Sequence, residues 1–486
     1  MELRGKKEKA GECEMKKQVF NPYLPSWEYV PDGEPHVFEE RVYVYGSHDR
    51  FNGFAYCLND YVCYSAPVDD LSDWRYEGVI YEKTNDPLNA DGSMCLYAPD
   101  VVRGPDGKYY LYYVLDKVPI VSVAVSDTPA GKYSFYGYVR DIDGTRLGER
   151  SNDQPQFDPA VLAEGDKVYL YTGFCGPGDI SRKGAMATVL APDMLTMIEE
   201  PVIIVPGNCY GSGTGFEGHE FFEAPSIRKH GDTYYFVYSS GQMHELCYAT
   251  SMCPTKGFTY RGAIVSNCDE NITYRKPAGM HTYVPGNNHG GMVEVLGQWY
   301  IFYHRHTNGT NFSRQGCAEP VRIKEDGSIE QVEMTSCGLN GGPLIGKGEY
   351  FAYIACNLFS KTMKNDHLLH HAGWIDGKYP RITQDGRDGD EEMGYIANMQ
   401  DSTIAGFKYF ECKGITRISL KTRGYGNGYF EVKIAWDGET LGKIPVGYSN
   451  VWVVNSADIM IPDGVQALFY EFKGEGGISL SSFTLE

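Results

Sequence analysis

Ionisable side chains stand just before several apolar, strand-like segments of this sequence. Glu34 lies in GEPHVF, Asp158 in FDPAVL, Glu223 in FFEAPSI and His289 in NNHGGMV. A single Asp-Pro or Glu-Ala-Pro is usually a turn signal without chemistry. Carboxylates that converge on one place, however, can divide acid–base work, because one protonates a leaving oxygen while another activates water. Hydrolysis of a glycosidic bond requires that division.

A recurring hairpin-like segment indicates how these side chains could meet. Each copy is a short apolar strand, a tight turn and a Tyr-rich strand with alternating pattern. The copies are HVFEERVYVYGSHD, DVVRGPDGKYYLYYVLD, AVLAEGDKVYLYTGF, SIRKHGDTYYFVYSSG and GMVEVLGQWYIFYHRHT. Similar all-β units at near-constant spacing predict a five-bladed β-propeller, in which the first strand of every blade lines the central channel. A solenoid is the alternative, and the variable segments between copies count against it.

The composition favours an all-β chain and excludes several partners. The 486 residues include 38 Tyr, 22 Phe and 57 Gly, as expected for many short aromatic strands joined by glycine turns. A formal net charge of −20 argues against nucleic acid or an anionic membrane as partner, because both are polyanions. No apolar run reaches the roughly 18 residues of a membrane span. The sequence leaves the oligomeric state open.

The N-terminus and the cysteines favour a cytoplasmic location. Residues 1–18 are charged and lack the apolar core of a signal peptide. The 13 cysteines are scattered and mostly embedded in strand-like runs, without zinc-type Cys-x-x-Cys pairs. We interpret them as reduced, structural thiols.

Residues 20–330 resemble glycoside hydrolase family 43, whose members are mostly β-xylosidases, α-L-arabinofuranosidases and arabinanases. The resemblance is carried by NPYLPSWEYVPDGEP, VYVYGSHD, LYAPDVV, FDPAVL, FFEAPSIRK and NNHGGMVEVLGQWYIFYHR. It implies a five-bladed propeller that hydrolyses with inversion, in which the acid and the base are roughly 6.5–9.5 Å apart.

The resemblance also implies roles for individual residues. Glu223 would be the general acid, and Asp158 would raise the pKa of Glu223 and orient it. His289 would lie at the channel floor, where family members often hold calcium or water. Calcium near His289 is therefore the cofactor that we expect, and we expect no organic cofactor. Arg314, in FSRQ, would contact the innermost sugar.

The general base is less clearly marked, because the family's Ala-Asp-Pro motif is replaced here by Asp32-Gly33-Glu34-Pro35. Alignment on the proline puts Glu34 in the position of the base, and we favour it. A shift of two residues keeps the same strand face and would give the role to Asp32 instead.

Other polar and aromatic residues near these motifs are candidates for binding sugar. Trp27, Tyr97 and Asp100 could form pocket walls, because sugar rings stack on aromatic faces and hydroxyls bind carboxylates. A packing role is equally compatible with each. Glu217 and Glu220, in the Gly-rich loop before Glu223, are interpreted as solvated loop charges.

The repeat stops near residue 343, and a different strand pattern follows. We expect a charged extension over residues 1–18, the propeller over 19–343 and a β-sandwich over 344–486. The tail resembles family 6 carbohydrate-binding modules. Trp374, Trp436 and Trp452 are candidate sugar platforms, and the alternative is that the sandwich only supports the propeller.

Together these features predict an inverting, exo-acting glycoside hydrolase that releases terminal pentose or related sugars from plant-derived oligosaccharides. A β-galactosidase or galactofuranosidase specificity on the same fold is an alternative, as is a non-catalytic sugar-binding propeller. A retaining enzyme acting on fructosides is disfavoured, because that group's Asn-Asp-Pro-Asn opening is absent.

Overall fold

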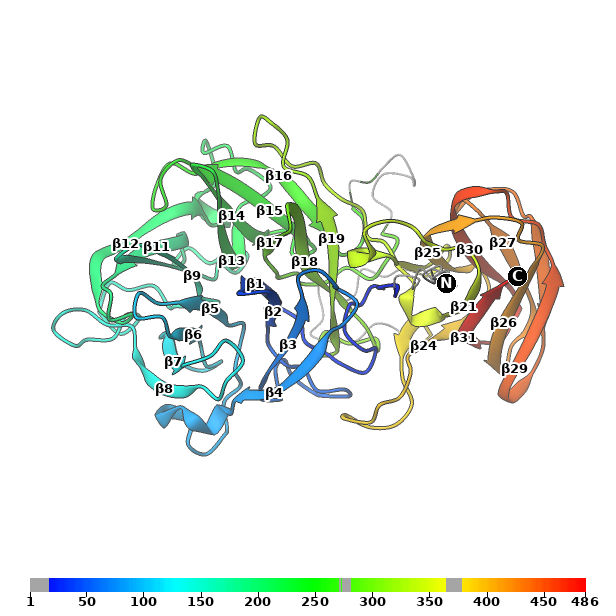
Figure 1. Cartoon of the computed structure of the whole chain (residues 1–486), viewed down its shortest axis with the longest axis horizontal. Helices are drawn as coiled ribbons and strands as arrows, with labels where there is room; N and C mark the ends of the chain where they lie inside the picture. The colour runs from blue at the N-terminus through cyan, green and yellow to red at the C-terminus, as the bar shows by residue number, and fades with distance from the viewer. Residues whose placement is uncertain (1–16, 271, 273–280, 364–377) are drawn as a thin grey trace, which may run out of the picture.

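The computed structural model describes residues 17–270, 272, 281–363 and 378–486, and these are mostly β-sheet (Figure 1). Strands up to β19 form five sheets, and later strands form two more. The prediction of an all-β chain, with a five-bladed propeller followed by a β-sandwich, is confirmed. The helices of the described residues are short 3-10 turns, and none has the length and apolarity needed to cross a membrane.

The first four blades are antiparallel meanders of four strands in chain order. Blade 5 has three strands in the described part of the chain, fewer than the four that the repeat predicts. The strands are β1 (Glu34–Phe38), β2 (Arg41–Tyr45), β3 (Tyr61–Pro67) and β4 (Arg75–Tyr81); β5 (Asp100–Arg103), β6 (Tyr109–Tyr113), β7 (Ser122–Ser126) and β8 (Ser134–Tyr138); β9 (Ala160–Glu164), β10 (Lys167–Thr172), β11 (Gly184–Leu190) and β12 (Met197–Pro206); β13 (Phe221–His230), β14 (Thr233–Ser240), β15 (Glu245–Ser251) and β16 (Thr259–Ser266); β17 (Met292–Val295), β18 (Gln298–His306) and β19 (Arg314–Val321).

The first strands of the blades form a closed ring. β1 contacts β5, β5 contacts β9, β9 contacts β13, β13 contacts β17, and β17 contacts β1. A parallel bridge between Gly33 and Gly290 closes the ring. A Cβ on Gly290 would lie 2.0 Å from the carbonyl oxygen of Phe302, so only glycine fits this closure. Residues just before each first strand therefore converge at one end of the channel.

Packing between blades explains why the second strands are rich in tyrosine. All residues of β6 (YYLYY) are buried. Successive side chains of a strand point to opposite faces, and here both faces are covered. Tyr113 and Leu111 pack in one cluster with blade 1, whereas Tyr112 and Tyr110 pack in another with blade 3. The large aromatic rings of these tyrosines fill the spaces between neighbouring blades.

The sandwich consists of two sheets with the orders β20-β25-β30-β27-β28 and β23-β24-β31-β26-β29. β22 pairs with β25, and β21 pairs with β31. The strands are β20 (Leu344–Ile345), β21 (Gly348–Phe351), β22 (Asn357–Ser360), β23 (Arg381–Thr383), β24 (Tyr395–Met399), β25 (Thr403–Cys412), β26 (Arg417–Gly424), β27 (Asn427–Lys433), β28 (Gly442–Val446), β29 (Ser449–Asp458), β30 (Gly464–Glu475) and β31 (Ile478–Leu485).

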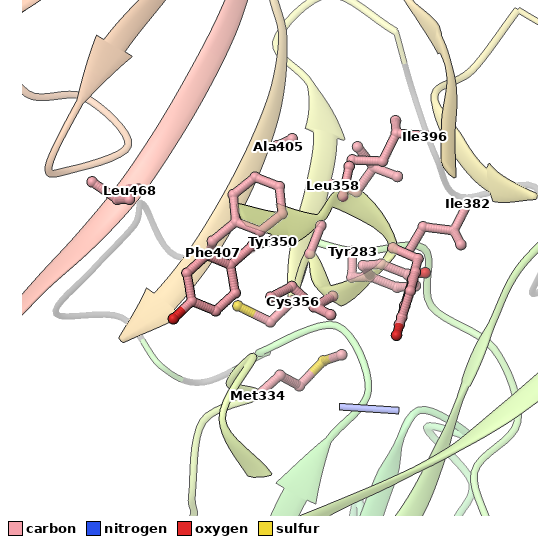
Figure 2. Close-up of a cluster of buried hydrophobic side chains, with 14 of the residues drawn as sticks. Tyr283, Met334, Tyr350, Cys356, Leu358, Ile382, Ile396, Ala405, Phe407 and Leu468 are labelled. Atoms are coloured by element: carbon pink, nitrogen blue, oxygen red, sulfur yellow. The ribbon is translucent and has the colours of Figure 1, made fainter. Parts of the chain in front are cut away.

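The propeller and the sandwich share one continuous hydrophobic cluster. Figure 2 shows Tyr283 and Met334 of the propeller beside sandwich residues such as Leu358 and Phe407. A buried lysine of β25 adds charge to this junction, because Lys408 Nζ lies 3.1 Å from carboxylate oxygens of Asp269 and of Glu333. The two parts are therefore packed as one body.

Candidate active site

A cavity of about 590 Å³ opens at the end of the channel where the first strands begin. One side is aromatic and forms a continuous band. Ring centroids are 5.5 Å apart between Tyr97 and Phe157, 5.2 Å between Phe157 and Phe174, and 5.2 Å between Phe174 and Phe222. Such a band suits the apolar faces of a sugar ring. The acidic and basic lining residues are Asp32, Asp116, Lys117, Asp158, Arg182, Glu223 and Arg314.

Unusual backbone conformations aim the carboxylates into the cavity. Asp32 has φ 57° and Asp158 has φ 45°, both in the left-handed region, which non-glycine residues rarely adopt. Ala224, next to Glu223, has φ 64°, and the pairing of β13 with β14 shifts register on both sides of Glu223. Strain of this kind concentrates at functional sites, and a bulge can redirect a side chain.

Asp32 is held by a buried network at the cavity floor. Arg314 Nη1 lies 2.9 Å from Asp32 Oδ1, and Ser47 Oγ donates to Asp32 Oδ2. Burial alone would raise the pKa of Asp32, but the guanidinium beside it keeps this pKa well below its usual range. Asp32 is therefore ionised at neutral pH.

Asp49 fixes Arg314 in place from the other side. Arg314 donates from Nε to Asp49 Oδ2 over 2.8 Å and from Nη2 to Asp49 Oδ1 over 2.9 Å. The ring of Tyr56 lies 4.8 Å from the guanidinium carbon. This bidentate geometry orients the remaining nitrogen toward Asp32.

Asp158 and Glu223 form a second, opposite electrostatic environment. Burial, followed by the negative charge of Asp32, raises the pKa of Glu223 to about 8. Burial and the neighbouring Glu223 also raise the pKa of Asp158. The backbone N–H of Ala224 donates to Asp158 Oδ2 over 3.3 Å. The two carboxyls titrate as a pair and retain a proton near neutral pH, so the cavity holds both an ionised and a protonated carboxyl.

His289 lies between these two environments. Its Nδ1 is 3.6 Å from Asp158 Oδ2 and 4.0 Å from Asp32 Oδ1. Burial lowers the pKa of His289 to about 4, so the imidazole is neutral at pH 7. In the part of the chain that the structure describes, three groups have donors spaced for a metal ion, and His289 belongs to none of them. The residues around His289 thus do not form a direct calcium cage, which needs several oxygen ligands.

The structure brings most of the predicted site residues together and separates three of them. Asp32, Tyr97, Asp158, Glu223, His289 and Arg314 line the cavity, whereas Trp27, Glu34 and Asp100 do not. Asp100 instead links residues of three blades. Its Oδ1 lies 2.6 Å from His36 Nε2, and its Oδ2 accepts the Val161 N–H over 2.8 Å. Glu217 and Glu220 also lie outside the lining residues.

Glu34, the residue that we favoured as the general base, does not line the cavity. Glu34 is the first residue of β1, two residues after the turn that carries Asp32. Its Oε2 accepts from Arg228 Nη2 over 2.8 Å and from Ser226 Oγ over 3.1 Å. The left-handed turn at Asp32 presents that carboxylate to the cavity instead.

The sequence interpretation missed several residues that line the cavity or hold its lining residues in place. Asp49 stands in the quoted motif VYVYGSHD and Asn287 stands in NNHGG, so both were within reach of a motif argument. Tyr56 and Cys57 follow Asp49 in an irregular loop, where no pattern marks a direction for the side chains.

The predicted sugar platforms of the sandwich have other contacts. The guanidinium carbon of Arg423 lies 4.3 Å from the Trp452 ring, which it covers. Trp436 packs against a small cluster that contains Phe359 and Phe469. Trp374 lies outside the described residues.

Comparisons with known proteins agree with this geometry. The family model for glycosyl hydrolases family 43 matches residues 30–329. A xylosidase/arabinosidase from Thermoclostridium stercorarium is 70% identical over 473 residues, which covers 97% of this chain and 99% of that protein. A xylosidase/arabinosidase from Bacteroides ovatus is 31% identical over 316 residues, 58% of this chain and 87% of that protein.

Solved structures extend the likeness to the fold. A family 43 arabinoxylan arabinofuranohydrolase from Bacillus subtilis, solved with cellotetraose, has a TM-score of 0.52 at 20% identity, covering 96% of this chain and 97% of that chain. At this identity the likeness shows the two-part fold alone. A family 43 β-xylosidase/α-arabinofuranosidase from a compost metagenome, solved with xylotriose in a calcium-free form, has a TM-score of 0.50 at 28% identity, covering 64% and 96%.

Proposed function

Because this chain belongs to glycosyl hydrolases family 43, we propose that its cavity releases terminal β-xylosyl or α-L-arabinofuranosyl residues from plant-derived oligosaccharides. One observation carries this proposal. The pKa of Asp32 is held well below its usual range, while burial raises the pKa of Glu223 to about 8 in the same cavity. A base and an acid are therefore both ready at neutral pH.

Asp32 is the proposed general base. Its carboxylate is ionised, lines the cavity and is oriented by Arg314, so it can accept a proton from a water molecule that attacks the anomeric carbon. Arg314 also stabilises the ionised form before the reaction. An attack by water on the face opposite to the leaving group inverts the anomeric configuration.

Glu223 is the proposed general acid, with Asp158 as its partner. Glu223 delivers its proton to the glycosidic oxygen as the bond breaks, so that even a strongly basic leaving group departs as a neutral alcohol. Asp158 keeps the proton on the pair by like-charge repulsion, and the Ala224 N–H fixes its orientation.

The proposed exo action follows from the closed floor of the cavity. Asp32, Arg314 and Asp49 form an ion-paired layer at the floor of the cavity. The end of an oligosaccharide would therefore fit here, whereas the interior of a polysaccharide would not. The aromatic band would hold the terminal ring. The relatives' names favour xylose and arabinofuranose over galactose or galactofuranose.

We also propose that a hydrated calcium ion can be held beside His289. The neutral imidazole lies 3.6 Å from an Asp158 oxygen and 4.0 Å from an Asp32 oxygen, and these groups suit a cation's water shell better than direct ligation. The calcium-free form named for one similar structure supports a cation in such sites. A cytoplasmic location is a further proposal, supported by the free thiols of all twelve cysteines among the described residues.

A panel of nitrophenyl glycosides tests the specificity. We expect hydrolysis of β-D-xyloside and α-L-arabinofuranoside, and NMR of the first product formed from xylobiose should show the inverted anomer. Preference for galactoside or galactofuranoside would overturn the proposed sugar. A retained anomer would overturn the assignment of Asp32 as base.

A further inference from the structure

We propose that the sandwich positions one wall of the catalytic cavity through Asp388. This residue lies in segment 384–394, which connects β23 to β24 and extends from the sandwich toward the propeller (Figure 1). The inference builds on catalysis in the cavity and gives the C-terminal sandwich a part in it that does not require sugar binding.

Asp388 contacts the propeller at two points. Its Oδ1 accepts the Phe51 N–H over 2.7 Å, and its Oδ2 accepts from Asn59 Nδ2 over 3.1 Å. A neighbouring contact repeats the pattern, since Tyr29 OH donates to Gln384 Oε1 over 2.7 Å and the Tyr29 ring stacks on Phe51 at 5.6 Å. The sandwich segment thus holds both ends of one propeller loop.

That loop, residues 46–60 between β2 and β3, supplies part of the cavity. It carries Asp49, which binds Arg314, and it carries Tyr56 and Cys57, which line the cavity. The loop contains no strand or helix. Its shape therefore depends on side-chain contacts rather than on a regular ladder of backbone hydrogen bonds.

A short series of contacts leads from Asp388 to the proposed base. Asn59 Nδ2 also donates to the carbonyl oxygen of Asp49 over 3.1 Å. The Asp49 carboxylate accepts the Cys57 N–H over 3.0 Å and forms the bidentate pair with Arg314. Arg314 in turn binds Asp32. Asp388 is accordingly a positioning residue that acts through Asn59 and Asp49.

Removing the Asp388 carboxylate should loosen the loop without unfolding the protein. Asp388 is exposed, and exposed substitutions usually change stability little. Misplacing Tyr56 and Arg314 should weaken both sugar binding and the chemical step. We expect kcat/KM of Asp388→Ala to fall about tenfold, less than the roughly 100-fold that a displacement of about 1 Å can cost.

The experiment compares variants on the nitrophenyl glycoside that the wild type hydrolyses fastest. Asp388→Ala should raise KM about threefold and lower kcat about threefold, with an unchanged melting temperature. A larger unfolded fraction cannot raise KM, so this rise separates positioning from lost stability. Asp388→Asn keeps an oxygen for the Phe51 N–H and should restore part of the activity. The control is Glu392→Ala, an exposed carboxylate of the same segment whose side chain lies against Gly386.

A second comparison tests the path of the effect. Asn59→Ala should reproduce the loss, and the double variant should be little worse than either single variant, because each substitution breaks the path through the Asp388–Asn59 hydrogen bond. Full additivity, unchanged kinetics of Asp388→Ala, or a loss that only follows the melting temperature would each overturn the inference. A wild type inactive on the whole panel would instead overturn the proposed function.

Discussion

Arg314 and Asp32 form a buried ion pair at the floor of the cavity, with 2.9 Å between Nη1 and Oδ1. Arg314 is itself held by Asp49, so the pair cannot rotate freely. The consequence is a carboxylate that stays ionised beside a pair of carboxyls that retains a proton. This contrast allows one cavity to supply a base and an acid at the same pH.

Because Arg314 keeps Asp32 ionised, we expect the variant in which an amide replaces the Asp32 carboxylate to be nearly inactive. Asp32→Asn should lower kcat about 10³-fold with little change in KM, because the amide cannot accept a proton. Azide should partly restore Asp32→Ala and give the inverted product. Glu34→Gln is the matched control, since it lies outside the cavity. An inactive Glu34→Gln with an active Asp32→Asn would contradict the assignment.

The loss of activity on replacing Glu223 should increase with the basicity of the leaving group. Glu223→Gln should lose about 10³-fold in kcat on xylobiose, which needs protonation of the leaving oxygen. The loss should be much smaller on a dinitrophenyl glycoside, which leaves without a proton. Steady-state kinetics on both substrates check this. Equal losses would exclude Glu223 as the acid.

The pH–rate profile should have an alkaline limb that is set by the Asp158–Glu223 pair. The acid must be protonated, and the pKa of Glu223 is raised to about 8, so activity should fall as pH rises through about 8. Activity should persist at low pH, since the pKa of Asp32 is held well below its usual range. In Asp158→Asn the lost negative charge should move the alkaline limb to lower pH. An unmoved limb would argue against the coupling.

Chelation tests the proposed hydrated calcium beside His289. Treatment with EDTA should lower the melting temperature slightly, and added calcium should restore it, because a cation that binds only the folded state stabilises it. His289→Ala should lose this response. If EDTA changes neither the melting temperature nor the activity of the wild type, the proposal fails.

Lys408 should be important for stability rather than for catalysis. Its ammonium is buried and pairs with Asp269 and Glu333 across the junction of sandwich and propeller. Lys408→Ala removes the cation that lies beside the buried Asp269 carboxylate and the Glu333 carboxylate, which should lower the free energy of unfolding by about 3–5 kcal/mol. Denaturant unfolding measures this loss. Lys413→Ala, at an exposed position just after the same strand, provides the control.

The blades could be predicted from the sequence because they are local. Each hairpin, such as HVFEERVYVY, carries its own alternation and turn, and five copies are enough to indicate the propeller. Asp158 and His289 precede first strands and Glu223 lies near the start of β13, so the repeat itself placed them at one end of the channel. Their convergence needed no knowledge of distant contacts.

The choice between Asp32 and Glu34 was decided only by the tertiary structure. Both stand before or at the start of β1, and the sequence does not reveal that φ turns left-handed at Asp32. The partners that decide their states are far away in the chain: Arg314 for Asp32 and Arg228 for Glu34. The contact of Asp388 with Phe51 likewise joins two parts of the chain that no repeat relates. The sequence thus determines the strands and hairpins of the blades locally. The protonation and position of each carboxylate depend instead on which distant charges the closed ring brings beside it.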